Sequence, residues 1–402
     1  MGLLAVQDAL DRITADVAPL AAETVALANG ASRVLAVGLA ARMTQPPFDA
    51  SSMDGYAVRA DDVANIPVTL DIIGEAAAGH GLHSPLGSGQ AARIFTGAPL
   101  PPGADAVVIQ EVAERDGNRV TVRESVVAGE YVRPKGLDFV QGEKLLSTGR
   151  RLAARDITLA AAMGHAELSV RRMPEIAILA TGDELVAPGT MPGADQIISS
   201  IPDGLAAMVE SAGGRARRLG IARDSLDSLG EHLQSAKSAD VLVTIGGASV
   251  GAHDLVQTAL KQIGLTLDFW KIAMRPGKPL MFGRLGDLRV LGLPGNPVSA
   301  LICGRVFLVP LIHALLGQEA SMEMGHVGVL AEELEGNGPR QHYMRAMTRG
   351  RDRDGLAIVA PAASQDSSIM SLLSQSDCLI VRPPHAPALL AGAKVNLLTL
   401  DF

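Results

Sequence analysis

The chain has 402 residues, of which 48% are hydrophobic, 19% charged and 3% aromatic. This length exceeds one ordinary hydrophobic core, so we expect two to four domains, and the composition is typical of a well-packed globular protein. The formal net charge of −8 argues against a general binder of nucleic acid or of membrane surfaces. The two cysteines, Cys303 and Cys378, provide neither a disulfide framework nor a metal-ligand spacing.

The amino-terminal residues carry no basic stretch followed by a continuous apolar run, so we expect no signal peptide. The most hydrophobic segment, residues 298–316, contains Arg305, Pro310 and His313 and predicts a buried helix rather than a membrane span. We therefore expect a cytoplasmic protein.

The first part of the chain is predicted to contain two regions. Residues 3–17 carry apolar side chains at helical spacing, which indicates an amphipathic helix that serves as a packing or dimerisation surface. After Gln45, short alternating runs separated by glycine and proline clusters predict a β-rich domain over residues 44–141. Helical spacing returns afterwards, so residues 1–43 and 142–172 are expected to form one region interrupted by this insertion.

Residues 173–318 are predicted to form an α/β domain, because four short apolar runs each end in a turn rich in glycine or carboxylates. The runs are 176–180, 219–222, 241–245 and 289–293. In a doubly wound parallel sheet such turns line one edge, so their polar groups converge into a candidate active site. For the first run alone a buried helix is the alternative. For its turn, Thr181 to Glu184, taken alone, the alternative is a polar connection with an ordinary helix cap. Short strands and turns beyond residue 319 predict a small closing β domain.

Three loops of the predicted insertion are polar. Asp54-Gly55 alone would be read as a hairpin turn, although the serines and aspartate before it are more polar than a hairpin requires. Phe95-Thr96-Gly97 precedes a proline-rich turn that would present Thr96, and Arg133 to Asp138 forms a charged turn. Each loop alone favours a structural role.

A basic cluster interrupts the acidic chain at Trp270 to Pro279, with Lys271, Arg275 and Lys278 held by Pro-Gly and Pro. Constrained cations beside glycine-rich turns suit a phosphate or another oxyanion, and the alternative is an ordinary surface hairpin. Carboxylates beside a phosphate require an intervening cation, and Mg²⁺ binds both kinds of oxygen. The sequence therefore predicts a phosphorylated ligand with Mg²⁺ near the carboxylates Asp183, Glu184, Asp224 and Asp254.

Six motifs, in this order, resemble one family: SSMDGYA, IFTGAPLPPGAD, ATGDEL, GGASVGAHD, WKIAMRPGKP and GLPGNPVSA. The family is molybdopterin molybdenumtransferase, the molybdenum-insertion enzyme of molybdenum-cofactor synthesis, to which the C-terminal domain of gephyrin also belongs. The resemblance covers nearly the whole chain, and GLPGNPVSA is its most specific motif.

The resemblance implies an α/β multidomain fold: an extended N-terminal region, a β-rich insertion, a molybdopterin-binding α/β domain and a C-terminal β-barrel. It implies that molybdate is inserted into adenylylated molybdopterin with Mg²⁺-dependent release of AMP. It further implies an elongated homodimer whose active site pairs the α/β edge of one subunit with the β insertion of the other. Molybdopterin adenylyltransferase and molybdoenzyme chaperones are expected partners, and nucleic acid and membranes are not.

The resemblance assigns a catalytic role to Glu184, Asp54, Asp224, Asp254 and Lys271, and a metal-binding role to Glu184, Asp224 and Asp254. Glu184 is the carboxylate that we expect to be indispensable. The turns and the resemblance together give the following substrate-binding positions: Thr96, Asp138, Thr181, Gly182, Asp183, Gly246, Gly247, Ser249, Arg275, Lys278, Pro294, Gly295, Asn296, Pro297, Arg345 and Ser367.

The chain also departs from the family pattern. Ile201 stands where the family usually has asparagine, Ile245 replaces a threonine, and Arg275 replaces a lysine. Two alternatives follow. A binding or scaffold paralogue would keep the molybdopterin pocket without turnover, and the two isoleucines favour it. The molybdopterin adenylyltransferase that precedes this step resembles only the α/β part.

Overall fold

The computed structural model describes residues 3–246, 255–320 and 326–400. Its contacts divide the chain into two compact units, residues 1–23 with 171–402, and residues 24–170. The predicted domain boundaries stay predictions. The division places the first helix, α1 (Val6–Thr14), in the unit of the α/β sheet, away from the rest of the predicted region 1–43.

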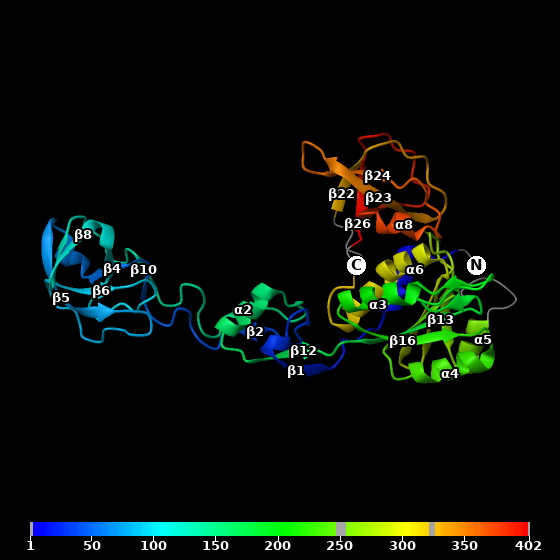
Figure 1. Ribbon diagram of the computed structural model, residues 1–402, viewed down its shortest axis with the longest axis horizontal. Coiled ribbons are helices and arrows are strands. Elements are labelled where there is room, and N and C mark those ends of the chain that lie inside the picture. Colours follow the sequence, from blue (N-terminus) through cyan, green and yellow to red (C-terminus); the bar gives the residue numbers. More distant parts are fainter. Residues whose placement is uncertain (1–2, 247–254, 321–325, 401–402) are drawn as a thin grey trace. The chain divides into compact units, whose positions relative to one another are not determined.

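A six-stranded sheet forms the centre of the larger unit (Figure 1). Its strands, in spatial order, are β16 (Arg215–Ala222), β13 (Glu175–Thr181), β17 (Val241–Ile245), β21 (Leu288–Leu293), β20 (Met281–Leu285) and β18 (Thr266–Trp270). The first four are parallel, β20 pairs antiparallel with β21, and β18 pairs antiparallel with β20. The four predicted strands are confirmed, and the helix alternative for the first run is wrong. β18 and β20 were not predicted.

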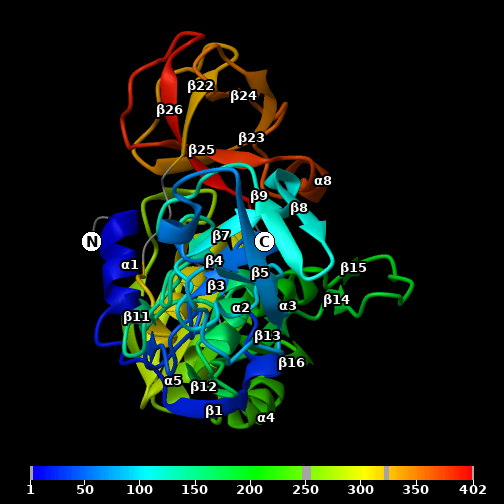
Figure 2. The ribbon, with the colours of Figure 1, turned by 90° about the vertical axis from the view of Figure 1, so that its left-hand side faces the viewer.

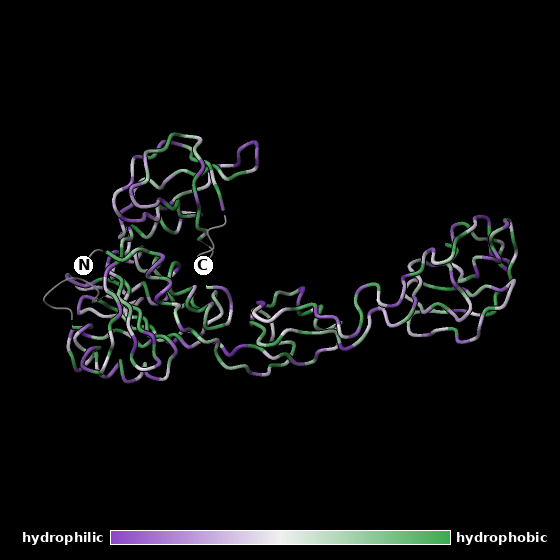
Figure 3. Tube along the Cα trace, turned by 180° about the vertical axis from the view of Figure 1, so that it is seen from behind, coloured by the Kyte–Doolittle hydropathy of each residue, from purple (hydrophilic) through white to green (hydrophobic). Residues whose placement is uncertain are grey.

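Helices cover both faces of this sheet, as a doubly wound fold requires (Figure 1). One face carries α4 (Leu226–Ala236) and α5 (Leu255–Gln262), whose leucines pack against Leu179, Leu242 and Val290 of the sheet. The other face carries α3 (Ile201–Ser211), α6 (Pro297–Cys303), the π-helical segment η4 (Gly304–Leu308) and α7 (Val309–Leu315). Hydrophobic stretches alternate with hydrophilic loops along the chain (Figure 3).

Within the described part of the chain, one helical run, Pro297–Leu315, has the length and hydropathy of a membrane span. However, 89% of its most apolar window is buried inside the protein. It is a core helix, as the sequence predicts. α1 packs against α7 and η4 through its buried face of Val6, Ala9, Leu10 and Ile13. The predicted amphipathic helix is therefore confirmed, and its apolar face is used within this unit.

The C-terminal part closes into a barrel (Figure 2). The strand order is β23 (Gln341–Arg351), β24 (Ala357–Pro361), β22 (His326–Leu330), β26 (Lys394–Thr399) and β25 (Cys378–Arg382), and β25 pairs again with β23. Helix α8 (Met370–Ser374) follows β24. The short strand β19 (Met274–Arg275) leaves the α/β part and pairs in parallel with β23. The basic segment connects the antiparallel pair β18 and β20, so the hairpin alternative is correct about the topology, and β19 within it additionally pairs with the barrel.

The smaller unit contains a second six-stranded sheet, in the order β7 (Ala106–Ile109), β4 (Gly55–Val58), β6 (Gln90–Ile94), β5 (Val68–Ala76), β9 (Arg119–Val122) and β8 (Ala113–Asp116). The remaining elements are three short strand pairs, three 3₁₀ turns and one helix: β3 (Ala50–Ser51) with β10 (Val132–Arg133), β2 (Leu39–Ala40) with β11 (Lys144–Leu146), β1 (Ala22–Ala26) with β12 (Glu167–Arg171), η1 (Leu27–Asn29), η2 (Ala60–Val63), η3 (Gln110–Val112) and α2 (Ala154–Ala162).

Asp54-Gly55 does not form a hairpin turn, contrary to the structural reading of that pair. β3 pairs with β10, whereas β4, which begins at Gly55, pairs with β6 and β7. Gly55 is required for another reason, because a Cβ at this position would overlap the carbonyl oxygen of Val108. The close approach of β4 to β7, and not a turn, explains this glycine.

Candidate functional site

The α/β sheet changes its direction of growth between β13 and β17. From β13 the chain passes through α3 to β16 on one side, and then through α4 to β17 on the other. In an open α/β sheet, the strand ends at such a switch point leave a crevice where ligands bind. The predicted sheet edge therefore contains one position that topology favours over the rest.

A cavity of about 130 Å³ lies at this position. The end of β13 contributes Thr181, the turn after it Glu184, the end of β17 Gly246, and the turn after β21 Gly295 and Pro297. Three of the four parallel strands, β13, β17 and β21, thus place residues that are more than 100 positions apart around one space. The predicted convergence of Thr181, Glu184, Gly246, Gly295 and Pro297 is confirmed.

Two glycines allow the strand ends to approach each other here. Gly246 has φ +89°, and a Cβ on it would lie 2.9 Å from the carbonyl oxygen of Thr181. A Cβ on Gly295 would lie 3.7 Å from the Cα of Gly246. Only glycine combines the backbone conformation and the spacing found at Gly246, whereas the 3.7 Å at Gly295 is an ordinary van der Waals contact. Neither residue brings a side chain to the cavity.

Glu184 brings a carboxylate to the cavity. Its side chain lies over Gly182, where Oε1 would be 2.8 Å from a Cβ on that glycine, so Gly182 makes room for the carboxylate. The backbone N–H of Ile197 donates to the carbonyl of Glu184 at 2.8 Å, which anchors the turn through the pair β14 (Leu185–Val186) and β15 (Ile197–Ile198). Both strands project from the α/β part (Figure 2).

Asp183 and Asp224 occupy neighbouring turns outside the cavity. Asp183 Oδ1 accepts a hydrogen bond of 3.2 Å from the backbone N–H of Asp224, which joins the turn after β13 to the turn after β16. Of the described residues that line the cavity, Glu184 alone is ionisable. Asp183 therefore holds two turns of the sheet edge together, while Glu184 lines the switch-point cavity.

The opposite wall of the cavity is apolar apart from two hydroxyls. Four isoleucines line it, Ile197, Ile198, Ile201 and Ile245, together with Ser199 and Ser200. Neither serine side chain makes a hydrogen bond with a described residue. These two hydroxyls were not among the predicted site residues, although they sit in the segment where the chain departs from the family pattern.

The loop that carries Ser367 lies against the start of α6. Asn296 donates from Nδ2 to Oγ of Ser367 at 2.9 Å, and the backbone N–H of Val298 donates to the carbonyl of Ser367 at 3.2 Å. These two hydrogen bonds join the GLPGNP turn to the C-terminal part. Both Asn296 and Ser367 lie beside, and not on, the cavity wall.

Arg345 holds this loop and does not reach the cavity. Its guanidinium donates to the carbonyls of Ile369, Ser364 and Asp366 at 2.8 to 2.9 Å, and its side chain is 1% exposed. Burial lowers the pKa of this guanidinium below its ordinary value. The structure thus shows Arg345 positioning this loop, and its contact with substrate stays a prediction.

The three cations of the basic segment are separated. Lys271 stacks over Trp270 with Nζ 4.8 Å from the ring centroid, and its φ of +84° fixes the start of the connection. Arg275 and Lys278 are exposed. Gly277 between them packs against Cys303 of α6, so closely that a Cβ would lie within 3.0 Å of Sγ. None of the three cations lines the switch-point cavity.

Asp54 and Thr96 form a pair in the smaller unit. Thr96 donates from its backbone N–H and from Oγ1 to Oδ1 of Asp54, each at 2.8 Å. These two bonds, with Arg93 nearby, lower the pKa of the Asp54 carboxyl below its ordinary value. Asp138 is exposed, and its backbone N–H donates to the carbonyl of Gln45. The predicted positions Gly247, Ser249 and Asp254 lie outside the described residues.

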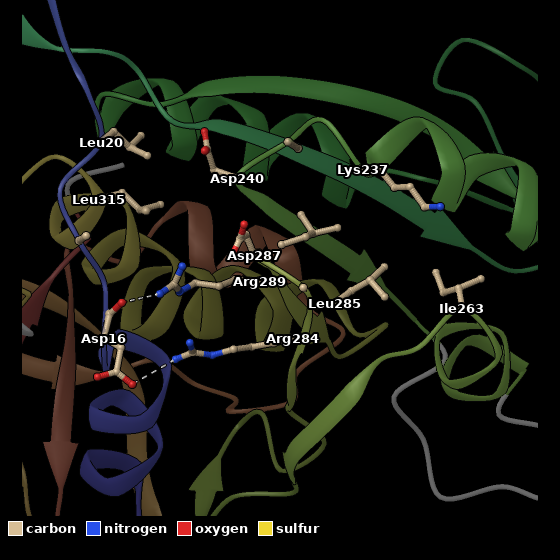
Figure 4. Close-up of a pocket in the computed structure, with 14 residues that line it drawn as sticks. Asp16, Leu20, Lys237, Asp240, Ile263, Arg284, Leu285, Asp287, Arg289 and Leu315 are labelled. Atoms are coloured by element: carbon tan, nitrogen blue, oxygen red, sulfur yellow. Dashed lines mark hydrogen bonds and ion pairs between the residues drawn. The ribbon is translucent and has the colours of Figure 1, made fainter.

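A larger cavity of about 660 Å³ lies at the amino ends of the parallel strands (Figure 4). There Arg284 donates to the carbonyl of Ala15, and Arg289 donates to the carbonyl of Asp16. Nearby, Arg172 donates to both carboxylate oxygens of Asp240. These bonds fasten the segment after α1 to the β20–β21 turn. The larger space is therefore an anchoring region, and the smaller switch-point cavity is the candidate active site.

Comparison with known proteins finds matches along nearly the whole chain. Three family models match: MoeA N-terminal region (domain I and II) at residues 4–164, probable molybdopterin binding domain at 177–314, and MoeA C-terminal region (domain IV) at 327–400. The chain is 36% identical to the molybdopterin molybdenumtransferase of a Nostoc species, covering 93% of this chain and 87% of that protein. The enzyme of the same name from Haemophilus influenzae is 33% identical, with 94% of each chain covered. The chain belongs to the molybdopterin molybdenumtransferase family.

The fold agrees with this membership. The crystal structure of a molybdopterin biosynthesis MoeA protein from Pyrococcus horikosii superposes with a TM-score of 0.85 at 30% identity, covering 100% of both chains. The predicted fold class, with its insertion, α/β domain and C-terminal barrel, is confirmed. As a member of this family, the chain is an enzyme of molybdenum cofactor biosynthesis.

The Mg²⁺ that the family implies fits the described residues if the substrate supplies part of its oxygen ligands. Within residues 3–246, 255–320 and 326–400 there is no group of three or more His, Cys, Asp or Glu side chains that could hold a metal. Glu184 at the cavity and Asp224 in the next turn are hard oxygen donors, and Mg²⁺ commonly binds one or two carboxylates together with substrate phosphates. The donor set is therefore compatible with Mg²⁺ held partly by its substrate.

Proposed function

We propose that the chain inserts molybdate into adenylylated molybdopterin and releases AMP in an Mg²⁺-dependent reaction. The observation that carries this proposal is the switch-point cavity, in which one carboxylate, Glu184, faces bare backbone at Gly246 and Gly295. A cation-binding carboxylate beside backbone without side chains suits a phosphoanhydride ligand, because Mg²⁺ binds carboxylate and phosphate oxygens together.

Each described residue then has a limited task. Glu184 and Asp224 would hold the Mg²⁺, which when bound polarises the phosphoanhydride. Thr181, Ser199 and Ser200 offer hydroxyls along the cavity walls for the polar groups of the substrate. Sulfur ligands for molybdenum come from the pterin, so the buried thiols Cys303 and Cys378 are not needed for this chemistry.

The proposal includes a homodimer with a shared site. A second copy of the chain would supply Asp54 and Thr96, whose two mutual hydrogen bonds keep an ionised carboxylate in a fixed orientation. The Asp54–Thr96 pair would then have a role in the substrate site. Molybdopterin adenylyltransferase and molybdoenzyme chaperones remain proposed partners, and a cytoplasmic location remains proposed as well.

One observation favours a second candidate, a molybdopterin-binding paralogue without turnover. Ile201 and Ile245 line the cavity with apolar side chains where the family pattern has polar residues. Such a wall could retain the pterin while removing contacts on which the reaction depends. The adenylyltransferase reading is weaker, because the insertion and the C-terminal barrel exceed what that single-domain enzyme needs.

The test measures AMP release from adenylylated molybdopterin by the purified whole chain, with and without molybdate and Mg²⁺. Glu184→Gln keeps the shape of the side chain and removes its charge, and we expect a loss of at least about a hundredfold, the lower range for a group that acts in the transition state. Glu210→Gln, an exposed glutamate at the end of α3, is the matched control and should retain full activity.

The outcomes separate the candidates. Molybdate-dependent release that Glu184→Gln abolishes supports the proposed reaction. Tight substrate binding without release by the unmodified chain would establish the binding paralogue instead. Transfer of an adenylyl group from ATP to molybdopterin would favour the adenylyltransferase.

A further inference from the structure

The C-terminal barrel has a polar mouth. Met344 and Ala346 of β23 and Cys378 and Ile380 of β25 point into the barrel core. Because side chains of a strand alternate between its faces, His342 and Arg382 continue these two series at one end of the barrel. His342 and Arg382 lie directly opposite each other across the β23–β25 ladder.

A third strand adds a cation to the same row. Arg275 of β19 lies opposite His342 in the parallel ladder, so Arg275, His342 and Arg382 are neighbours across three adjacent strands. All three line one cavity of about 240 Å³, together with Gln365, Met344 and the turn Leu334 to Gly338. Cross-strand neighbours share a face of the sheet, which explains why these three side chains meet.

The electrostatic environment of this mouth is strongly positive. His342 is 7% exposed, and its pKa is lowered to about 4, first by burial and then by Arg275, Arg340, Arg382 and Arg345. At neutral pH the histidine is therefore uncharged. Among the described residues that line the cavity, Glu335 carries the one carboxylate, whereas Arg275 and Arg382 carry two guanidinium groups.

Arg382 lacks a compensating anion. Its side chain is 2% exposed, and Nη2 donates to the backbone carbonyls of Glu335, Ala386 and Pro387. Nε and Nη1 are buried without a partner among the described residues. A buried guanidinium with neutral partners alone is unfavourable, and a negative charge in the adjoining cavity would offset that cost.

We propose that the barrel mouth binds a small tetrahedral oxyanion of the phosphate, sulfate and molybdate class. Guanidinium groups match the geometry of such oxygens, and a neutral imidazole adds a further hydrogen-bond donor. A cavity of about 240 Å³ lies below the roughly 300–1,000 Å³ of pockets that enclose larger ligands. The site therefore takes a free oxyanion or a single terminal phosphate group.

This site is separate from the switch-point cavity. His342 and Met344 face the barrel interior, whereas Arg345 lies on the alternate face of β23 and holds the loop of Ser367 beside α6. The inference consequently stands whether or not the chain releases AMP.

The test uses equilibrium dialysis of the whole protein with radiolabelled molybdate, phosphate and sulfate, and in parallel the ring signals of His342 in a two-dimensional NMR spectrum. His342→Gln identifies those signals. Binding should shift them, and Arg275→Gln and Arg382→Met should each weaken binding at least tenfold. Arg349→Gln is the control, because it removes an exposed arginine from the far end of the same strand.

Arg275→Gln alters an exposed residue and keeps the test valid if the buried Arg382 variant does not fold. A response to AMP equal to that to phosphate identifies a terminal phosphate as the source, and a response to free anions alone identifies an inorganic ion. The proposal is overturned if the His342 signals do not move at millimolar concentrations of any of these anions. An equal loss of binding in Arg349→Gln would overturn it as well, because it would indicate general charge attraction.

Discussion

The contact between Gly277 and Cys303 gives the sharpest prediction about the basic segment. Gly277 has φ +107°, and Cys303 is fully buried in α6. In Gly277→Ala, a Cβ would lie within 3.0 Å of Sγ of Cys303 and 3.6 Å from Sδ of Met274. The substitution therefore strains the backbone and overfills a packed site at the same time.

The two costs can be estimated separately. Placing an L side chain at positive φ costs about 1–2 kcal/mol, and overpacking a core position costs about 1–3 kcal/mol. We expect Gly277→Ala to lower the free energy of unfolding by about 2–5 kcal/mol, the sum of these terms. The chain contains a single tryptophan, Trp270, at the end of β18, so its fluorescence during urea unfolding reports on this part of the protein.

Two further variants separate the contributions. Gly286→Ala has φ +60° with nothing within 4 Å of its Cβ, so it should show the backbone cost alone, about 1–2 kcal/mol. Cys303→Ala removes Sγ, so the double variant with Gly277→Ala should be less destabilised than the two single effects added together, by about 1–3 kcal/mol. The reasoning is refuted if Gly277→Ala is no worse than Gly286→Ala, or if the two single effects simply add.

Three other substitutions test the site. Gly246→Ala should destabilise the α/β part by about 2–4 kcal/mol in the same fluorescence assay, because its Cβ meets a strand carbonyl that cannot move; unchanged stability would contradict the packing. Thr96→Val should raise the pKa of Asp54, measured by carboxyl NMR, toward its ordinary value. In the unmodified protein that lowered pKa gives a stabilising contribution that is present at neutral pH and is lost as the pH falls through the folded-state pKa. Valine keeps the backbone N–H, so an unaltered pKa would show that the hydrogen bond from Oγ1 of Thr96 is absent in solution. Arg345→Met leaves three backbone carbonyls without their donor, so we expect a loss of about 2–4 kcal/mol in thermal unfolding and faster proteolysis of residues 364–369; equal protease resistance would argue against the positioning role.

Local sequence patterns predicted most strands of the α/β part, because buried parallel strands are short apolar runs between breakers. β18 and β20 were missed because their interrupted pattern, with Asp268 and Gly283, resembles a loop. The role of Gly55 was also misread. Asp-Gly is a hairpin signal in general, and the close carbonyl of Val108 that requires glycine lies more than 50 residues away.

The candidate site was predicted in part. The turns after β13, β17 and β21 were expected to converge, and the cavity at the switch point contains Thr181, Glu184 and Gly246. The hydroxyls of Ser199 and Ser200, which line the cavity, were missed. In the sequence, their segment drew notice only because Ile201 replaces the family's asparagine. Two adjacent serines just before the position of the replaced asparagine were the sequence signal that could have identified these hydroxyls.

The sequence by itself determined the family, the order of the elements and the carboxylate most closely tied to the site, since these depend on motifs and on the spacing of apolar residues. Tertiary structure alone decided which polar residues face a cavity and which hold a loop. Asp183 and Arg345 look alike as candidate ligand-binding residues in the sequence, yet Oδ1 of Asp183 and the guanidinium of Arg345 make hydrogen bonds with backbone groups. It also decided that Arg275, His342 and Arg382 meet, because the register of three strands from distant segments places them in one row.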